Sequence, residues 1–196
     1  MVTRGVAPMN LDLSQANSPS LLVFALPLAP PPASVYEQGI AVGLSSAARA
    51  TDGTRAVGAK TSNYLGSVLA LHEVKQRGGQ EALICGPTGE VVEGATSNVF
   101  VVRDGGLLTP PLEAGILAGI TRQTVLDLAA RTGLSVHELP LHPHDLYQAA
   151  EVFITSSVRE VVPVVRVDDV VIANGRPGPI TQRVLAAYRA ETSVQR

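Results

Sequence analysis

The stretch ALICGPTGEVV, residues 82–92, decides the fold of this chain of 196 residues. Two apolar runs flank Gly86-Pro87-Thr88-Gly89, and glycine and proline at such positions favour a tight reversal of the chain. This pattern predicts a β-hairpin. A second hairpin is predicted directly after it, because apolar residues 99–102 and 107–108 flank Asp104-Gly105-Gly106. Consecutive hairpins favour antiparallel pairing over a doubly wound parallel sheet.

Outward from these hairpins, short strands and helices are mixed without a regular strand–helix–strand repeat. Further strands are predicted at residues 21–26, 40–44, 134–139, 152–155, 161–167 and 170–172. Helices are predicted to begin at Thr61, Thr121, Asp145 and Pro179. The proline run 30–32 reads as a stiff connector, and residues 45–57 read as a linker. The mixture predicts an α+β fold.

Composition excludes several classes of protein. The formal charge is −2, from 15 Lys and Arg against 17 Asp and Glu, which argues against a nucleic-acid surface. Aromatic residues make up 4% of the chain, too few for base-stacking platforms. The single cysteine, Cys85, excludes a disulfide scaffold and fits a reducing compartment, so we expect a cytoplasmic protein. We expect this thiol to be inert within its strand.

One segment imitates a secretory signal. Residues 21–26 are apolar and follow Arg4, but Asp12 precedes them and several prolines follow. A buried strand that ends at a proline-rich turn explains this segment better. No apolar run in the sequence is long enough to cross a bilayer, so no membrane association is expected.

Two ionisable residues stand where they could serve a cofactor. Lys60 is predicted at a helix N-terminus, where the helix dipole lowers the pKa of an amine and frees its lone pair for Schiff-base chemistry. Glu93 ends a predicted strand, where a carboxylate could hold the protonated nitrogen of a pyridine ring. On local evidence alone, an ordinary surface lysine and a turn carboxylate explain them better.

Three polar segments are further candidates. Residues 117–122 form a glycine-containing turn that runs into a helix, whose free amides and Thr121 hydroxyl could hold a phosphate. Thr155-Ser156-Ser157 follows a strand and could meet a phosphate or carboxylate. A plain helix cap and a polar turn remain the alternatives. His137, His142 and His144 lack metal-ligand spacing, so no metal is expected.

The order of these motifs carries more information than any one of them. The motifs are KTSNYL at 60–65, EG at 93–94, SNVF at 97–100, LAGITR at 117–122, FITSS at 153–157, PV at 163–164 and GRPGPIT at 175–181. In this order they resemble the class IV aminotransferases, which are pyridoxal-phosphate enzymes of fold type IV. The resemblance implies a mixed, barrel-like C-terminal sheet domain at 56–196. It also implies that residues 1–55 are the end of a smaller N-terminal α/β domain together with the interdomain linker.

The resemblance implies roles for individual residues. Lys60 would form the Schiff base with pyridoxal 5'-phosphate and shuttle the substrate α-proton. The remaining cofactor residues would be Glu93 at the ring nitrogen, Leu117 on the ring, Ile120 and Thr121 at the phosphate, and Ser156 and Ser157 beside phosphate and substrate carboxylate. Arg159 could contact an acidic substrate, and a surface ion pair is the alternative. An amino acid and a 2-oxo acid would be the substrates, and a homodimer the assembly.

The match leaves three functions open. The first is amino transfer between an amino acid and a 2-oxo acid. The second is aminodeoxychorismate lyase activity, which uses the same lysine and cofactor. The third is a truncated, non-catalytic remnant, since no residue here matches the phosphate-binding arginine of the family's first domain. Met9 and Leu11 stand where D-amino-acid enzymes have an arginine and a histidine, so that specificity is not expected.

Overall fold

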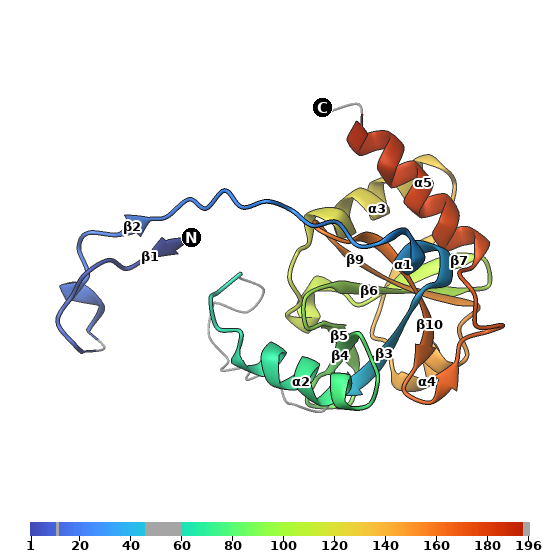
Figure 1. Ribbon diagram of the computed structural model, residues 1–196, viewed down its shortest axis with the longest axis horizontal. Coiled ribbons are helices and arrows are strands. Elements are labelled where there is room, and N and C mark those ends of the chain that lie inside the picture. Colours follow the sequence, from blue (N-terminus) through green and yellow to red (C-terminus); the bar gives the residue numbers. More distant parts are fainter. Residues whose placement is uncertain (11, 46–59, 194–196) are drawn as a thin grey trace.

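The computed structural model describes residues 1–10, 12–45 and 60–193 (Figure 1). A nine-stranded sheet forms the body, in the order β5-β4-β3-β10-β9-β6-β7-β8 with β11 beside β10. The strands are β3 (Ile40–Ser45), β4 (Glu81–Cys85), β5 (Val91–Gly94), β6 (Asn98–Arg103), β7 (Gly106–Thr109), β8 (Val136–Glu138), β9 (Glu151–Ser156), β10 (Glu160–Val167) and β11 (Val170–Val171). Strand β3 runs parallel to β4 and β10, and β7 parallel to β8, while the other pairs are antiparallel. The predicted α+β class is therefore confirmed.

The sheet is strongly curled. Strands β5 and β6 stand five places apart in the sheet, yet three residues connect Gly94 to Asn98. In a flat sheet with strands about 4.8 Å apart they would be about 24 Å from each other. Four Cα–Cα steps of about 3.8 Å reach at most about 15 Å, so the sheet has to bend back on itself. A bridge between Val91 and Leu141 joins the other side of β5 to the chain beyond β8.

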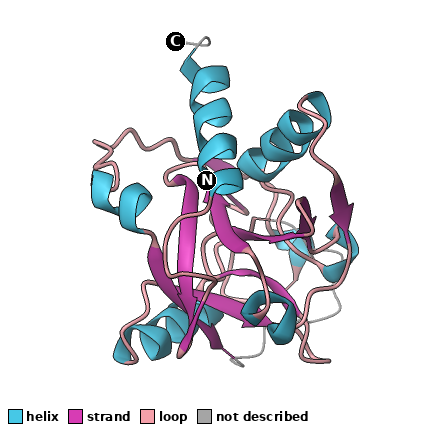
Figure 2. Ribbon diagram, turned by 90° about the vertical axis from the view of Figure 1, so that its right-hand side faces the viewer, coloured by secondary structure: helices cyan, strands magenta, loops and turns pink. Residues whose placement is uncertain are grey.

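In the described part of the chain, five α-helices pack outside the sheet (Figures 1 and 2). They are α1 (Ala33–Gln38), α2 (Leu65–Gln76), α3 (Ile120–Arg131), α4 (Pro143–Tyr147) and α5 (Pro179–Ser193). Apolar side chains from α3 and α5 meet the sheet around Phe100 and Phe153, whose stacked rings lie 4.9 Å apart. Helix α2 buries Ala70 and Val74 against β4. Helices α2, α3 and α5 thus cover apolar residues of the sheet.

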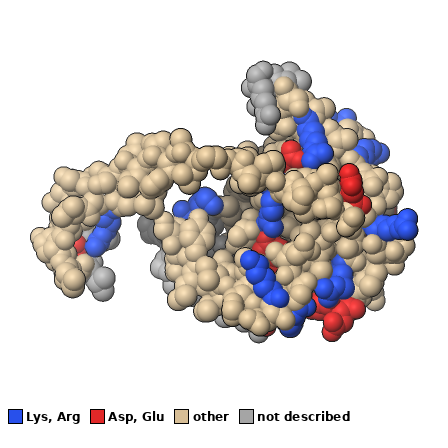
Figure 3. Space-filling view, viewed as in Figure 1, with Lys and Arg blue, Asp and Glu red and all other residues tan. Residues whose placement is uncertain are grey.

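The first part of the chain lies apart from the body as an arm. Strands β1 (Val2–Thr3) and β2 (Ser20–Leu21) form a separate two-stranded sheet. An extended segment connects this sheet to α1 (Figure 1). Few charged side chains appear along the arm (Figure 3), and Val23, Phe24 and Leu26 are 65–85% exposed. The arm therefore presents apolar groups to solvent.

The structure confirms the two predicted hairpins and corrects several boundaries. The strand predicted at 21–26 is wrong, since β2 ends at Leu21 and the following residues have no neighbouring strand in the described chain. The proline connector leads into α1, which was not predicted. Helix α4 begins at Pro143 rather than Asp145, because Pro143 fits a first helical position and Asp145 bonds back to the His142 amide.

Some predictions concern residues outside the described ones. Leu11 and most of the predicted linker at 45–57 belong there. The predicted boundary between 55 and 56 falls there too and stays a prediction, although β3 on its N-terminal side already belongs to the large sheet. Within the described residues, no helix combines the length and apolar character needed to cross a bilayer.

Candidate functional site

The candidate site forms where three strand ends meet the start of α3. Glu93 is the next-to-last residue of β5, Asn98 opens β6, and β9 ends at Ser156. In the antiparallel register, Asn98 lies opposite Thr155. The sheet's curl thus gathers residues that are about 60 positions apart in the sequence.

Glu93 and Asn98 hold the backbone of Leu117 from two sides. A Glu93 carboxylate oxygen accepts a hydrogen bond from the Leu117 amide at 2.9 Å. The Asn98 side-chain amide donates to the Leu117 carbonyl, also at 2.9 Å. Asn98 is buried and Glu93 is half-buried. The structure therefore brings two predicted site residues together and adds Asn98, which had been quoted in a motif without a role.

Gly119 allows the Leu117 segment to approach β6. A Cβ atom at this position would lie 2.1 Å from the Asn98 side-chain oxygen, closer than real contacts allow. Any larger residue would push the segment away from Asn98. The glycine of the LAGITR motif thus serves close packing, because its φ of −67° is open to any residue.

Helix α3 begins directly after this glycine. Gly119 is the N-cap and has no side chain to satisfy the amides of the first turn. Ile120 is 79% exposed and Thr121 is 2% exposed, so their side chains point to opposite sides. A depression of about 320 Å³ opens at this helix start, lined by Leu112, Ala118, Gly119, Ile120, Arg122, Gln123 and Thr124.

Three buried hydroxyl oxygens near these strand ends are without a hydrogen-bond partner among the described residues. They belong to Ser97, Thr121 and Thr155. A buried hydroxyl left unpaired costs about 1–3 kcal/mol, so these three are candidate partners for a polar ligand, although the Arg122 Nε and the Thr181 hydroxyl are unpaired as well. Thr121 was predicted. Thr155 belongs to the candidate segment 155–157, whereas Ser97 was missed, although it stands in the SNVF motif.

The two predicted serines differ in their surroundings. The Ser156 hydroxyl is half-buried and accepts bonds from the Arg159 amide at 3.3 Å and the Arg159 Nε at 3.4 Å. Ser157 is exposed at the tip of the turn between β9 and β10. The hydroxyl of Ser156 is therefore engaged within the turn, whereas Ser157 faces solvent.

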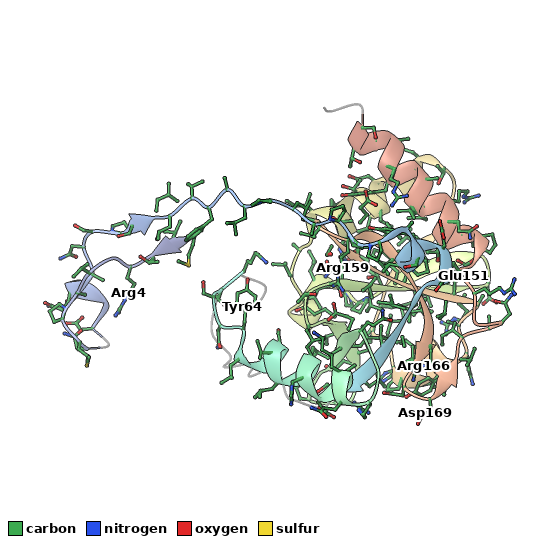
Figure 4. All side chains as sticks on the ribbon, viewed as in Figure 1. Arg4, Tyr64, Glu151, Arg159, Arg166 and Asp169 are labelled. Atoms are coloured by element: carbon green, nitrogen blue, oxygen red, sulfur yellow. The ribbon has the colours of Figure 1, made fainter. Side chains whose placement is uncertain are left out.

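Arg159 forms an ion pair with a carboxylate of the same chain. Its guanidinium pairs with Glu81, which is 1% exposed, and donates to the Thr96 hydroxyl at 2.6 Å. The Thr96 hydroxyl in turn donates to Glu81 at 2.7 Å. Figure 4 shows Arg159 at the body of the molecule, away from the arm, and its side chain is 23% exposed. An ion pair was one of the two predictions for Arg159, and the structure differs from it only in that the partner carboxylate is buried rather than at the surface. The contact with an acidic substrate stays a prediction.

Lys60 lies before α2 rather than at its start. The helix begins at Leu65 with Tyr64 as its N-cap, so the predicted position at a helix N-terminus is wrong. The polar side chains of Ser62 and Asn63 compete for backbone groups and disfavour a helix over this stretch. Lys60 is exposed, and its Nζ lies 5.9 Å from the centre of the Tyr64 ring. None of the described contacts links it to Glu93 or Leu117.

The chain belongs to the class IV amino-transferases. The family model described as "Amino-transferase class IV" matches residues 1–167. The curled mixed sheet is accordingly that of a fold-type-IV enzyme, and the family implies pyridoxal phosphate as the cofactor.

Named relatives agree with this assignment. The branched-chain-amino-acid aminotransferase of Escherichia coli K12 is 40% identical over 157 residues, which are 80% of this chain and 51% of that protein. A Methanocaldococcus jannaschii protein, provisionally assigned the same activity, is 39% identical over 96% of this chain and 65% of its own length. The chain thus spans between half and two thirds of the length of these relatives.

Solved structures match the fold at similar identity. The crystal structure of the Escherichia coli branched-chain enzyme superposes with a TM-score of 0.77 at 38% identity and covers 83% of this chain and 53% of that one. The branched-chain enzyme of Thermobaculum terrenum in its pyridoxal-phosphate form gives 0.76 at 35% identity, covering 80% and 52%.

The residues present fit this cofactor. The unpaired hydroxyls of Thr121 and Thr155 and the free amides of the α3 first turn are donors of the kind a phosphate group requires. Glu93 supplies a half-buried carboxylate suited to a protonated ring nitrogen. Of the residues assigned to the cofactor, only Ile120 lines the depression beside Gly119, so that depression adds nothing to this fit.

Proposed function

We propose that the protein is a pyridoxal-phosphate-dependent aminotransferase that moves an amino group between an amino acid and a 2-oxo acid. The observation that carries the proposal is the group formed by Glu93, Asn98, Leu117 and the buried Thr121 hydroxyl, set within a fold of this family. The names of the relatives favour a branched-chain amino acid as donor, and they favour amino transfer over elimination to an aminobenzoate.

Each residue has a stated task in this proposal. Glu93 holds the proton on the ring nitrogen, and Leu117 packs against the ring. The amide of Ile120 and the hydroxyl of Thr121 bind the phosphate, with Ser156 and Ser157 beside the phosphate and the substrate carboxylate. Pyridoxal phosphate, when bound, supplies a cationic conjugated ring that takes up the electron pair left by the departing α-proton. The amine of Lys60 removes that proton and returns it during turnover.

The assembly and location are proposals as well. We propose a homodimer, supported by the exposed apolar residues of α2 and the arm. A cytoplasmic location is supported by the single cysteine. We retain the division at residues 55 and 56 as the boundary between the end of a first domain with its linker and the cofactor-binding domain.

The chain's two lysines provide the test of the Lys60 assignment. The protein is incubated with pyridoxal phosphate, reduced with borohydride and digested, and the modified peptides are identified by mass spectrometry. We expect the phosphopyridoxyl group on Lys60 and loss of the visible absorption band in Lys60→Ala. The control is Lys75→Ala, which removes the chain's other lysine, on α2, and should retain the band. Modification of Lys75 at an equal level would contradict the assignment.

Activity is measured in parallel with a branched-chain amino acid and 2-oxoglutarate. We expect turnover by the wild-type chain and by Lys75→Ala, and none by Lys60→Ala, because the proton acceptor is lost. A chain that retains the cofactor on Lys60 without any turnover would support the non-catalytic alternative instead.

A further inference from the structure

We propose that Arg159 is a positioning residue, which clamps the turn after β9 to the loop between β5 and β6 and so fixes the buried hydroxyls of Thr155 and Ser97 that flank the cofactor site. The inference rests on the proposed function for the identity of the ligand. It assigns Arg159 to the architecture of the site rather than to recognition of substrate.

The clamp closes through three side chains from three segments. Glu81 comes from β4, Thr96 from the loop after β5, and Arg159 from the turn after β9. Each of the three is hydrogen-bonded to the other two. A displacement of the turn or of the loop would break two of these three bonds.

The positive charge of Arg159 is already paired with a carboxylate of the protein. The Glu81 carboxylate is 1% exposed, and the Arg159 side chain is 23% exposed. A buried carboxylate depends on its partner, because removing one member of such a pair leaves an uncompensated charge. A substrate carboxylate that drew Arg159 away from Glu81 would leave Glu81 in that state, which favours a positioning role for Arg159.

The hydroxyls without partners lie next to the clamped groups. Ser97 follows Thr96 directly, and Thr155 precedes Ser156, whose oxygen accepts bonds from Arg159. Thr155 also lies opposite Asn98, the residue that holds Leu117. The clamp is therefore joined by short covalent and hydrogen-bonded steps to both sides of the site.

Further contacts hold the same turn from outside. The Tyr36 hydroxyl of α1 donates to the Arg159 carbonyl at 3.4 Å. Arg189 of α5 donates to Glu160 from its Nε at 2.8 Å and from a terminal nitrogen at 2.7 Å. Glu160 has a φ of 58°, a conformation that side chains rarely adopt and that surrounding contacts must maintain. Arg189 thus offers a matched control, an ion pair on the same turn that does not include Glu81 or Thr96.

The test compares pyridoxal phosphate with pyridoxal, which lacks the phosphate. Binding of each to the 196-residue chain is measured by absorption for wild type, Arg159→Met, Arg159→Lys and Arg189→Met. We expect Arg159→Met to weaken binding of the phosphorylated ligand roughly tenfold, the equivalent of one charge-assisted bond, with pyridoxal nearly unchanged. Arg159→Lys should recover part of the loss, and Arg189→Met should leave the ratio of the two affinities at the wild-type value. An equal loss for both ligands, or the same change in Arg189→Met, would overturn the proposal.

A second measurement does not depend on the ligand. Hydrogen–deuterium exchange of the ligand-free chain should show faster exchange at residues 94–98 and 155–160 together in Arg159→Met and in Glu81→Gln. Unchanged exchange in either segment would overturn the clamp. A wild-type chain that shows this coupling but binds neither ligand would instead contradict the proposed function and remove the cofactor from the inference.

Discussion

Gly119 stands at a position where one methyl group has no room. Because its Cβ would lie 2.1 Å from the Asn98 side-chain oxygen, Gly119→Ala should separate Leu117 from Asn98. Overpacking of this kind costs about 1–3 kcal/mol. We expect a lower free energy of unfolding in urea and weaker retention of pyridoxal phosphate.

Gly66 provides the control for that substitution. It lies in α2 with no atom within 4 Å of its Cβ position among the described residues, so Gly66→Ala should be neutral or stabilise by less than about 1 kcal/mol. Equal stability losses in the two variants would refute the explanation by close packing.

Cys85 is predicted to react slowly with alkylating reagents at neutral pH. Burial raises the pKa of its thiol, and the charges of Asp168 and Glu90 raise it further. A raised pKa leaves less of the reactive thiolate at pH 7, so the midpoint of the rate against pH should lie above that of an ordinary cysteine. Asp168→Asn should move the midpoint down, which iodoacetamide kinetics would reveal, and an unshifted midpoint would count against this account.

The residues of the site were predictable where a motif named them. Glu93, Leu117 and Thr121 stand in recognisable local patterns, and the structure brings them together. Thr155 was part of a candidate segment, but neither the burial of its hydroxyl nor any role for Ser97 could be predicted, because both depend on pairing of β6 with β9 across more than 50 residues. The partner of Arg159 was equally hidden, since Glu81 is 78 positions away.

Among the elements, α5 depends on a carboxylate that belongs to a strand. Glu151 of β9 is 6% exposed and accepts the amides of Ile180 at 2.9 Å and Thr181 at 2.7 Å. It thereby acts as the cap that the helix lacks in its own sequence. Glu151→Ala should reduce the free energy of unfolding by about 2–4 kcal/mol, because two charge-assisted bonds are lost.

Glu151→Gln and Glu191→Ala are the two controls for this loss of stability. The amide keeps one acceptor, so Glu151→Gln should lose less than the alanine variant. Glu191 on α5 pairs with Arg131 at the surface, with side-chain exposures of 39% and 56%. Its removal should cost less than about 1 kcal/mol. Denaturant titration orders the three variants, and a loss for Glu191→Ala as large as for Glu151→Ala would exclude the capping role.

The elements that have a local sequence signal were predicted correctly. The hairpins β4–β5 and β6–β7 follow from their turn residues. Helix α1 was missed, because the prolines before it indicated an extended segment, although Pro32 serves as its N-cap. Parallel pairing of β3 with β4 and β10 has no local signal at all, since it depends on how the whole sheet curls.

At the scale of the whole molecule, α2 presents an apolar stripe. Leu65, Val68 and Leu69 lie on one face of the helix and are 54–66% exposed. If this face forms the proposed dimer contact, the double variant Leu65→Gln, Leu69→Gln should weaken self-association at least roughly tenfold, as one buried leucine contributes about 1.5–3 kcal/mol.

Sedimentation velocity over a range of concentrations measures this change. Val171→Thr serves as control, because Val171 is 55% exposed on β11. It should leave the dissociation constant unchanged. An unchanged dissociation constant in the α2 variant would exclude this face as the contact.

The curl of the sheet also determines when the polypeptide can complete its fold during synthesis. Strand β3 ends at Ser45 and its partner β10 ends at Val167, so more than 120 residues must follow β3 out of the ribosome before the two strands can pair fully. Until then β3 and the first hairpin are left with unpaired edges, a state in which nascent chains associate wrongly. Closure by distant partners is also intrinsically slow. A ribosome stalled before residue 160 would therefore carry an open intermediate, and the curled sheet would be completed only once β10 has emerged.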